Sequence, residues 1–257
     1  LSKEGFDVYS KILDSSDFGV PQKRKRIFII GTKCDWDYIF PMGNNANFGN
    51  LISRKNVGEA IMDLVNSKSA INHQALNHSE IVIRRYEHIP EGGKLPPPEE
   101  LPIDIRRKNF GNTYQRLDRK KPSTTMVPGN NAFPVHPTLN RSLTPREAAR
   151  LQSFSDEHEF FGSRKMQCKL VGHAVPPLLA AVLANSIANH LLGGNDKTLR
   201  IDELVIRRGE YLGNKKSEGR KTFIDLFCGS GGFARGFIDA GFECVATSDF
   251  DTFVSDA

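Results

Sequence analysis

The chain has 257 residues, 39% of them hydrophobic and 25% charged, and 35 Lys and Arg against 30 Asp and Glu give a net charge of +5. This profile is typical of a soluble globular protein, no apolar run approaches a membrane span, and the mild positive charge suits a nucleic-acid partner or an ordinary basic enzyme. The cysteines (Cys34, Cys168, Cys228 and Cys244) are too scattered for a zinc site or a secreted disulfide framework. We therefore expect no metal site, no membrane association and a cytoplasmic setting, at the nucleoid if the protein is bacterial.

Two strands are predicted near the N-terminus. Residues 6–13 alternate apolar and polar side chains, as a half-buried strand does, and the apolar run of residues 27–30 predicts a buried strand. In the extended segment before the second strand, Gln22, Arg24 and Arg26 share one face. These polar side chains could order a water, a carboxylate or a base edge, whereas a basic edge strand that prevents aggregation is the simpler interpretation.

Helix signals follow in the middle of the chain. Asn56 and Glu59 have the spacing of a capping box, and residues 60–65 supply an apolar helical face. The proline-rich residues 88–140 predict irregular loops with short strands. A stronger helix start is Thr144-Pro145-Arg146-Glu147, in which Thr144 can cap and Glu147 can bond back to it.

The last third begins with a predicted buried helix at residues 178–192, opened by Pro176-Pro177, and continues with a charged linker. Residues 222–227 then predict a buried strand, followed by a glycine loop, a helix at residues 233–240 and a second strand at residues 243–247. This succession is typical of a doubly wound α/β sheet.

The glycine loop, Gly229-Ser230-Gly231-Gly232, has the composition of a cofactor site. Its glycines allow close approach of a ligand and a tight turn into the helix, and Asp249 at the end of the next strand can bond both ribose hydroxyls of an adenosine. The loop also fits a dinucleotide fingerprint, so nicotinamide binding stays open. A tight turn that merely packs on a helix is the non-functional interpretation.

The residues around this loop resemble a known family. Asp225-Leu226-Phe227-Cys228-Gly229-Ser230-Gly231-Gly232-Phe233 resembles the first motif of cytosine-5 DNA methyltransferases, which binds S-adenosylmethionine, and Ser248-Asp249-Phe250-Asp251 is similar to the second. The resemblance implies that the Phe227 backbone, Gly229 and Gly231 surround the methionine moiety, with Gly232 in the same site. It also implies that Asp249 binds the ribose and that Phe250 packs on adenine.

Three further segments are similar to motifs of the same family. Residues 17–26 match the eighth motif, which implies that Gln22, Arg24 and Arg26 lie at the active site and that Arg26 contacts the target cytosine. Residues 140–154 resemble the ninth motif, here a capped helix with Arg and Glu pairs at helical spacing.

Gly172-His173-Ala174-Val175-Pro176-Pro177 resembles the tenth motif, which normally has Asn in place of His173. Backbone amides at a helix start can hold the cofactor carboxylate, so the resemblance implies cofactor contacts for His173, Ala174 and Val175. Histidine can donate one side-chain hydrogen bond but lacks the two-sided geometry of the amide.

The stretch between the eighth and ninth motifs occupies the place of the family's target-recognition region. Basic side chains there could contact DNA phosphates. The candidates are Arg106, Arg107, Lys108, Arg119 and Lys120.

Two family segments are absent from the sequence: Pro-Cys, which carries the nucleophile, and Glu-Asn-Val, which carries the acid. The eighth to tenth motifs also precede the first and second, which is a circular permutation. In the family's sheet the missing strands lie between the cofactor strands and the strand of Arg26. We therefore expect a second polypeptide, or a missing segment, to supply them, and we expect this chain alone to be inactive.

These patterns predict an α/β fold with a doubly wound, Rossmann-like methyltransferase sheet, incomplete in this chain, and a small irregular target-recognition domain. The expected divisions are a catalytic part at residues 1–66, the recognition region at 67–140, closing helices at 141–193, a linker at 194–221 and the cofactor unit at 222–257. The leading hypothesis is a component of an S-adenosylmethionine-dependent cytosine-5 methyltransferase acting on double-stranded DNA. The alternatives are a non-catalytic DNA-binding or regulatory subunit and a nicotinamide oxidoreductase.

Overall fold

The computed structural model describes residues 1–43, 56–67, 69–107, 112–191 and 221–249. The chain divides into two compact units. Unit 1 comprises Leu1–Val20, Arg24–Arg54 and Val175–Asp256, and unit 2 comprises Pro21–Lys23 and Lys55–Ala174. The closing helices expected at residues 141–193 are therefore divided between the units: residues 141–174 group with the recognition region in unit 2, and residues 175–191 lie in unit 1. The three-residue segment that contains Gln22 belongs to unit 2.

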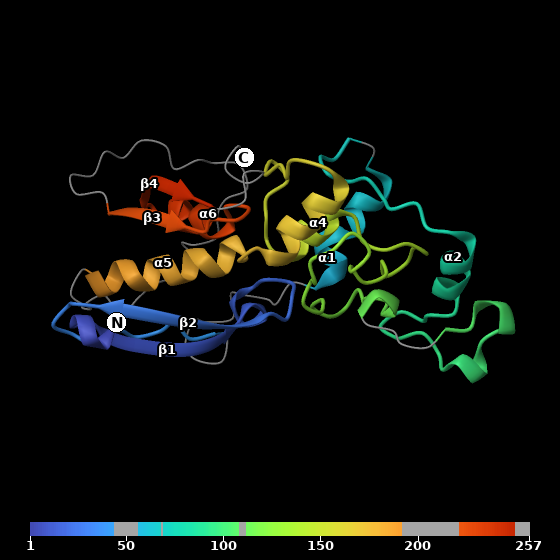
Figure 1. Cartoon of the computed structure of the whole chain (residues 1–257), viewed down its shortest axis with the longest axis horizontal. Helices are drawn as coiled ribbons and strands as arrows, with labels where there is room; N and C mark the ends of the chain where they lie inside the picture. The colour runs from blue at the N-terminus through green and yellow to red at the C-terminus, as the bar shows by residue number, and fades with distance from the viewer. Residues whose placement is uncertain (44–55, 68, 108–111, 192–220, 250–257) are drawn as a thin grey trace. The chain divides into compact units, whose positions relative to one another are not determined.

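The N-terminal strands of unit 1 form an antiparallel pair. After a short 3-10 helix, η1 (Ser2–Glu4), strand β1 (Asp7–Asp14) pairs with β2 (Lys25–Thr32), so both predicted strands are confirmed, the first shifted by one residue and the second longer than expected (Figure 1). The connection contains the 3-10 helix η2 (Ser15–Phe18). Asp14 fixes its geometry because one carboxylate oxygen accepts the N–H groups of Ser16 and Arg24, each at 3.1 Å.

The C-terminal part of unit 1 is the predicted strand–loop–helix–strand unit. Strand β3 (Thr222–Leu226) lies parallel to β4 (Glu243–Ser248), and helix α6 (Gly232–Asp239) connects them (Figure 1). Within the part of the chain that the structure describes, β1–β2 and β3–β4 are separate two-stranded sheets. The mixed α/β class is thus confirmed, whereas the continuous doubly wound sheet stays a prediction.

Helix α5 (Pro177–Leu191) carries the core of unit 1. Leu179, Val182 and Leu183 join a cluster with side chains of β1, η2 and residues 38–40, while Ala184 joins Phe237 and Phe242 in a second cluster. Helices α5 and α6 approach each other closely at Gly236. A Cβ atom there would lie 2.4 Å from the carbonyl oxygen of Pro177, which makes glycine a packing requirement.

Both strand pairs leave one face uncovered, and this corrects the prediction that residues 27–30 and 222–227 are buried. Ile27 and Ile29 are 63% and 57% exposed, and Ile224 and Leu226 are 61% and 64% exposed. The alternate residues Phe28, Ile30 and Phe223 pack into the two clusters. The burial prediction was wrong because each strand pair has a single apolar partner layer among the residues described.

Unit 2 is built from short helices and irregular segments. Its α-helices are α1 (Val57–Ile61), α2 (Glu80–Glu87), α3 (Pro145–Leu151) and α4 (Arg164–His173), and its 3-10 helices are η4 (Met62–Asn66), η5 (Pro98–Glu100), η6 (Ile103–Ile105) and η7 (Asn112–Tyr114). The irregular nature of the described residues between 88 and 140 is confirmed, but isolated bridges such as Arg116↔Val135 take the place of the short strands expected there.

The predicted helix starts are confirmed by their capping bonds. Thr144 accepts from the N–H of Glu147, and the Glu147 carboxylate accepts from the N–H of Thr144, which is a complete capping box. The expected Arg–Glu pairing at helical spacing is wrong, because Glu147 instead binds Arg141, which lies before the helix, at 2.6 and 2.8 Å. Asn56 caps α1 by accepting from the N–H of Glu59 at 2.9 Å.

A buried arginine organises the irregular part of unit 2. All five N–H donors of the Arg116 guanidinium are used. The acceptors are the carbonyl oxygens of Tyr86, Ile89, His136 and Leu139 and the side-chain oxygen of Asn140, at 2.6 to 2.8 Å. These bonds join three segments of the chain: the end of α2 with the residues after it, the strand-like segment of Arg116, and residues 136–140.

One helical stretch, Arg164–Leu191, is long and apolar enough to cross a membrane by length and composition, contrary to the impression from the sequence. However, 72% of its apolar window is buried within the protein, as in the core helix of a globular protein. Residues 174–176 separate its two halves, α4 and α5, and Pro177 is the first residue of α5.

Candidate functional site

The glycine loop between β3 and α6 has the backbone of a ligand cradle. Gly229 and Gly231 have φ angles of 55° and 73°, and a Cβ atom at either position would meet nothing within 4 Å. Phe227 also has a positive φ, of 63°, and is 75% exposed, which is unusual for a bulky residue. The loop therefore presents strained backbone beside open space, where a ligand could approach the main chain closely.

The acid predicted to bind ribose lies at this loop. Oδ2 of Asp249 accepts a hydrogen bond from the N–H of Gly229 at 2.8 Å. The N–H of Cys228 donates to the carbonyl oxygen of Ser248 at 3.0 Å, which holds the loop against the end of β4. The predicted aromatic partner, Phe250, lies outside the described residues.

Two further polar groups at the loop have hydrogen-bonding capacity to spare. Among the residues described, Ser230 Oγ and Asp225 Oδ2 are buried and have no hydrogen-bond partner. Burial raises the pKa of Asp225, as does the nearby charge of Asp249, while a bond from the N–H of Ala234 lowers it. Because unsatisfied buried polar atoms are costly, these two oxygens and the open glycine cradle fit a polar cofactor such as S-adenosylmethionine. Both residues lie in the segment that resembles the first motif, but the sequence pattern did not predict a role for them in the site.

Cys228 is poorly suited to act as a nucleophile. Burial raises the pKa of its thiol, and the carboxylates of Asp225 and Asp249 raise it further. Since the thiolate is the reactive form, this environment disfavours covalent chemistry. The expectation that Cys228 belongs to the cofactor loop agrees with this electrostatic setting.

The residues of the eighth motif differ in exposure. Gln22 in unit 2 is fully buried and Arg24 in unit 1 is 3% exposed, whereas Lys23 and Lys25 are exposed, as the predicted alternation requires. Burial, with a smaller contribution from the charge of Arg26, lowers the pKa of Arg24 to about 10, so Arg24 stays charged at neutral pH. Arg26 departs from the alternation because its side chain is exposed and donates to the carbonyl oxygen of Lys25 at 2.7 Å.

The tenth motif ends one helix and opens the next, so the predicted helix start at its prolines is confirmed. His173 is the last residue of α4, and the N–H of Ala174 already donates to the carbonyl oxygens of Leu170 and Val171. Prolines at positions 176 and 177 have no N–H to offer. The amide of Ala174 therefore caps α4 in this structure, and the contacts of His173, Ala174 and Val175 with a cofactor stay predictions.

The basic residues proposed to contact DNA have different surroundings in unit 2. Arg106 donates to the carbonyl oxygen of Leu101 at 3.0 Å, and the guanidinium of Arg107 lies 5.7 Å from the ring centroid of Tyr114. Arg119 makes three hydrogen bonds to the carboxylate of Glu91, so its charge is already neutralised, whereas the side chain of Lys120 is exposed. Lys108 lies outside the described residues.

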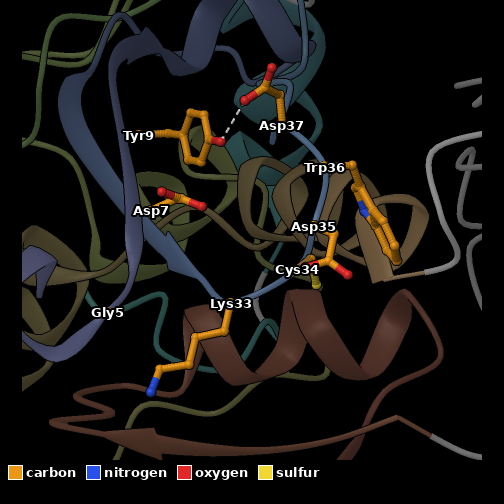
Figure 2. A pocket seen from close by; sticks show the side chains of 8 residues that line it. All are labelled: Gly5, Asp7, Tyr9, Lys33, Cys34, Asp35, Trp36 and Asp37. Atoms are coloured by element: carbon orange, nitrogen blue, oxygen red, sulfur yellow. Dashed lines mark hydrogen bonds between the residues drawn. The ribbon is translucent and has the colours of Figure 1, made fainter.

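A hollow of about 580 Å³ beside β1 lies away from all of these motifs in the sequence. Figure 2 shows the side chains around it, including the bond from the Tyr9 hydroxyl to Asp37 at 2.8 Å. Its lining residues are Gly5, Asp7, Tyr9, Lys33, Cys34, Asp35, Trp36 and Asp37. None of these lining residues belongs to a segment that resembles a family motif. The hollow therefore gives no support for Cys34 as a nucleophile.

A parallel strand–loop–helix–strand unit with an acid after its second strand is typical of cofactor-binding α/β enzymes. The profile of the C-5 cytosine-specific DNA methylase family matches residues 1–189 and 221–257, and the chain belongs to that family. One similar crystal structure is described as a DNA modification methyltransferase encoded within an E. coli prophage. Its TM-score is 0.55 at 22% sequence identity, and the match covers 73% of this chain and 61% of that chain, which supports the fold.

The similar sequences are Type II methyltransferases. M1.HphI of Haemophilus parahaemolyticus is 36% identical over 71% of this chain and 48% of its own length, and M.BbvI of Brevibacillus brevis is 32% identical over 72% and 50%. The chain thus spans about half the length of these relatives. M.AquIB of Picosynechococcus differs, because a match over 47% of this chain, at 35% identity, covers 89% of that relative.

Proposed function

We propose that this chain is a component of a DNA cytosine-5 methyltransferase that transfers a methyl group from S-adenosylmethionine to carbon 5 of a flipped cytosine. The observation that carries the proposal is the strained glycine loop with open space above Gly229 and Gly231 and the Asp249 carboxylate bonded to it. Membership of the methylase family supplies the reaction class. The Type II names of its relatives favour a role in a restriction–modification system.

In this proposal the loop residues bind the cofactor, which supplies an electrophilic methyl group. The backbone of Phe227, Gly229 and Gly231 accepts the methionine moiety, with Gly232 opening the helix beside it. Asp249 exchanges its bond to the Gly229 amide for bonds to ribose hydroxyls, and the spare oxygens of Asp225 and Ser230 bind polar groups of the cofactor. Phe250 stacks on adenine, and His173, Ala174 and Val175 approach from the tenth motif.

The eighth motif holds the target base. The reaction requires the cytosine to leave the DNA stack. Arg26 contacts the flipped cytosine, and Gln22 and Arg24 orient the groups around it. Because Arg26 is exposed while Arg24 is buried, Arg26 is the better placed of the two to meet a substrate. The residues proposed to contact DNA phosphates in the recognition region are Arg106, Arg107, Lys108 and Lys120. Arg119 is the weakest candidate because it already pairs with Glu91.

The nucleophilic cysteine comes from outside these residues, either from a second polypeptide or from a segment that this sequence lacks. Three observations support this part of the proposal. The sequence has no Pro-Cys, the chain spans about half of its longer relatives, and the outer faces of both strand pairs expose apolar side chains. M.AquIB, most of which is matched by part of this chain, is an example of a short methyltransferase chain.

Calorimetric titration tests the cofactor site. S-adenosylmethionine should bind in preference to NAD, and Asp249→Ala should weaken binding by roughly 1–3 kcal/mol, the range for lost hydrogen bonds to a charged group. Asp35→Ala, an exposed carboxylate at the hollow, is the matched control and should leave affinity unchanged. Equal affinity of the wild type and Asp249→Ala would defeat the assignment.

Transfer of a tritiated methyl group to DNA tests the catalytic part. The chain alone should be inactive, and addition of a polypeptide with the Pro-Cys and Glu-Asn-Val segments should restore transfer. In that complemented enzyme, Arg26→Ala should abolish transfer and leave cofactor binding nearly intact. DNA and cofactor binding without transfer under any complementation would favour the non-catalytic alternative.

A further inference from the structure

The backbone beside Gln22 is held by a segment about a hundred residues further along the chain. The N–H of Lys23 donates to the carbonyl oxygen of Ser123 at 2.9 Å, and the N–H of Ser123 donates to that of Pro21 at 2.9 Å. These two bonds make Gln22 and Ser123 a parallel bridge pair, and both are almost completely buried. A third bond comes from a side chain: the hydroxyl of Thr125 donates to the carbonyl oxygen of Lys23 at 2.7 Å.

The segment that makes these bonds is itself braced from its other end. The first two amides of α1, those of Val57 and Gly58, donate to the carbonyl oxygens of Lys121 and Arg119 at 3.0 and 2.8 Å. The carboxylate of Glu91 accepts both the backbone N–H and the guanidinium of Arg119. A Cβ atom on Gly58 would lie 2.9 Å from the Arg119 carbonyl oxygen, so this approach requires glycine. Residues 119–125 are thus fixed by contacts within unit 2 before they reach Lys23.

Thr125 differs from its neighbour in one respect. The hydroxyl of Thr124 is buried and has no hydrogen-bond partner within the described residues, whereas the hydroxyl of Thr125 accounts for one of the three bonds to Pro21–Lys23. The other two bonds are made by the main chain and cannot be removed by substituting a side chain. Two adjacent threonines therefore provide a bonded and an unbonded hydroxyl for comparison.

We propose that Thr125 is a positioning residue for methyl transfer. Its hydroxyl fixes the carbonyl of Lys23 and hence the direction in which the main chain leaves Gln22 and enters Arg24. A rotation of that peptide would redirect Gln22 and the arginines that follow it. The inference rests on the proposed role of Gln22, Arg24 and Arg26 at the target base. In this role Thr125 acts through Lys23 and need not contact the substrate.

The test compares Thr125→Val, Thr125→Ser and Thr124→Val in the complemented enzyme, with hydrogen exchange measured on the chain itself. Thr125→Val should lower kcat roughly three- to tenfold, the effect of losing one hydrogen bond, with KM for S-adenosylmethionine unchanged. The amide of Lys23 should exchange faster by a similar factor. Thr125→Ser keeps the hydroxyl and should retain both properties, and Thr124→Val should behave as the wild type.

Thr125→Ala replaces Thr125→Val if the valine variant does not fold. The proposal is overturned if the Thr125 variants that lack the hydroxyl match Thr124→Val in kcat and exchange, or if Thr125→Ser loses as much as Thr125→Val. Should the complemented enzyme not methylate DNA at all, the proposed function fails, and the exchange of the Lys23 amide alone decides whether Thr125 holds this segment.

Discussion

Units 1 and 2 achieve order in opposite ways. Unit 1 has regular strands and a central apolar helix, yet the outer faces of both strand pairs expose isoleucine and leucine side chains. Unit 2 has short helices and irregular loops, yet its buried arginines find acceptors in backbone carbonyls, as four of the five bonds of Arg116 demonstrate. The amount of regular secondary structure therefore does not indicate how well a unit buries its apolar groups or pairs its polar ones. The irregular unit provides hydrogen-bond acceptors for its buried Arg116, whereas the regular unit leaves apolar side chains exposed.

The largest expected effect tests the polar core of unit 2. Arg116→Met should lower the free energy of unfolding by about 3–5 kcal/mol, because five acceptors in a buried setting lose their donor together. Arg116→Lys supplies three donors without the planar fork and should also lose stability, but less. Urea denaturation measures both, with Arg84→Ala, an exposed ion pair, as the control that should change little. A loss no larger than that of the control would show that the irregular unit does not depend on this arginine.

The second prediction concerns a buried histidine in the same unit. Burial lowers the pKa of His136 to about 4, and its Nδ1 already accepts the N–H groups of Thr138 and Leu139 at 3.2 Å each. The unfolded chain therefore binds this proton more readily, and stability should fall as the pH drops from about 6.5 towards 4, by at most about 3 kcal/mol. Denaturation at several pH values should show that His136→Gln flattens this dependence, whereas the exposed His88→Gln does not.

A packing change tests the core of unit 1. Gly236→Ala should cost about 1–3 kcal/mol, even though alanine favours helix, because the new Cβ would lie within 2.6 Å of backbone atoms of Pro177 and Ala181. Ile238→Ala on the same helix removes a side chain that is 45% exposed and should cost less. Thermal denaturation compares the two variants. A neutral Gly236→Ala would mean that α5 and α6 can separate without loss.

The smallest effect is expected on the uncovered face of β2. Ile27→Thr combined with Ile29→Thr should change the free energy of unfolding by no more than about 0.5 kcal/mol, because both side chains are exposed and threonine also favours strands. The double variant should aggregate less in light scattering, since an apolar patch is removed. Phe28→Ala, on the inner face, is the contrasting variant and should destabilise the chain. A large loss from the double threonine variant would show that this face is covered after all.

Local sequence patterns predicted the features that depend on neighbouring residues. The capping box at Thr144, the helix after Pro177 and the glycine loop with its flanking strands are of this kind, because each is set by spacing within a few residues. The predicted burial of residues 27–30 was wrong, because an apolar run does not say which other layer covers it. Helices α2 and α4 were not predicted at all.

The features that depend on distant contacts could not be predicted. Thr125 and Lys23 are 102 residues apart, and no sequence pattern in either segment predicts the hydrogen bond between them. The capping role of the Ala174 amide required knowing where α4 ends, and α4 was missed. In the candidate site, the motif residues were found from their order, whereas the spare oxygens of Asp225 and Ser230 became visible only from their surroundings.

The two-sided packing of α5 has a consequence for synthesis on the ribosome. One side of the helix packs on residues that precede it in the chain, and the other packs on α6 and residues up to Phe242, which are translated later. At roughly 5–20 residues per second, the second side stays without its partner for seconds after the first has docked. During that interval the α6-facing side of α5, which includes Ala184, Ile187 and Ala188, is a surface that a chaperone could bind. The order of translation therefore delays the burial of this side of the helix.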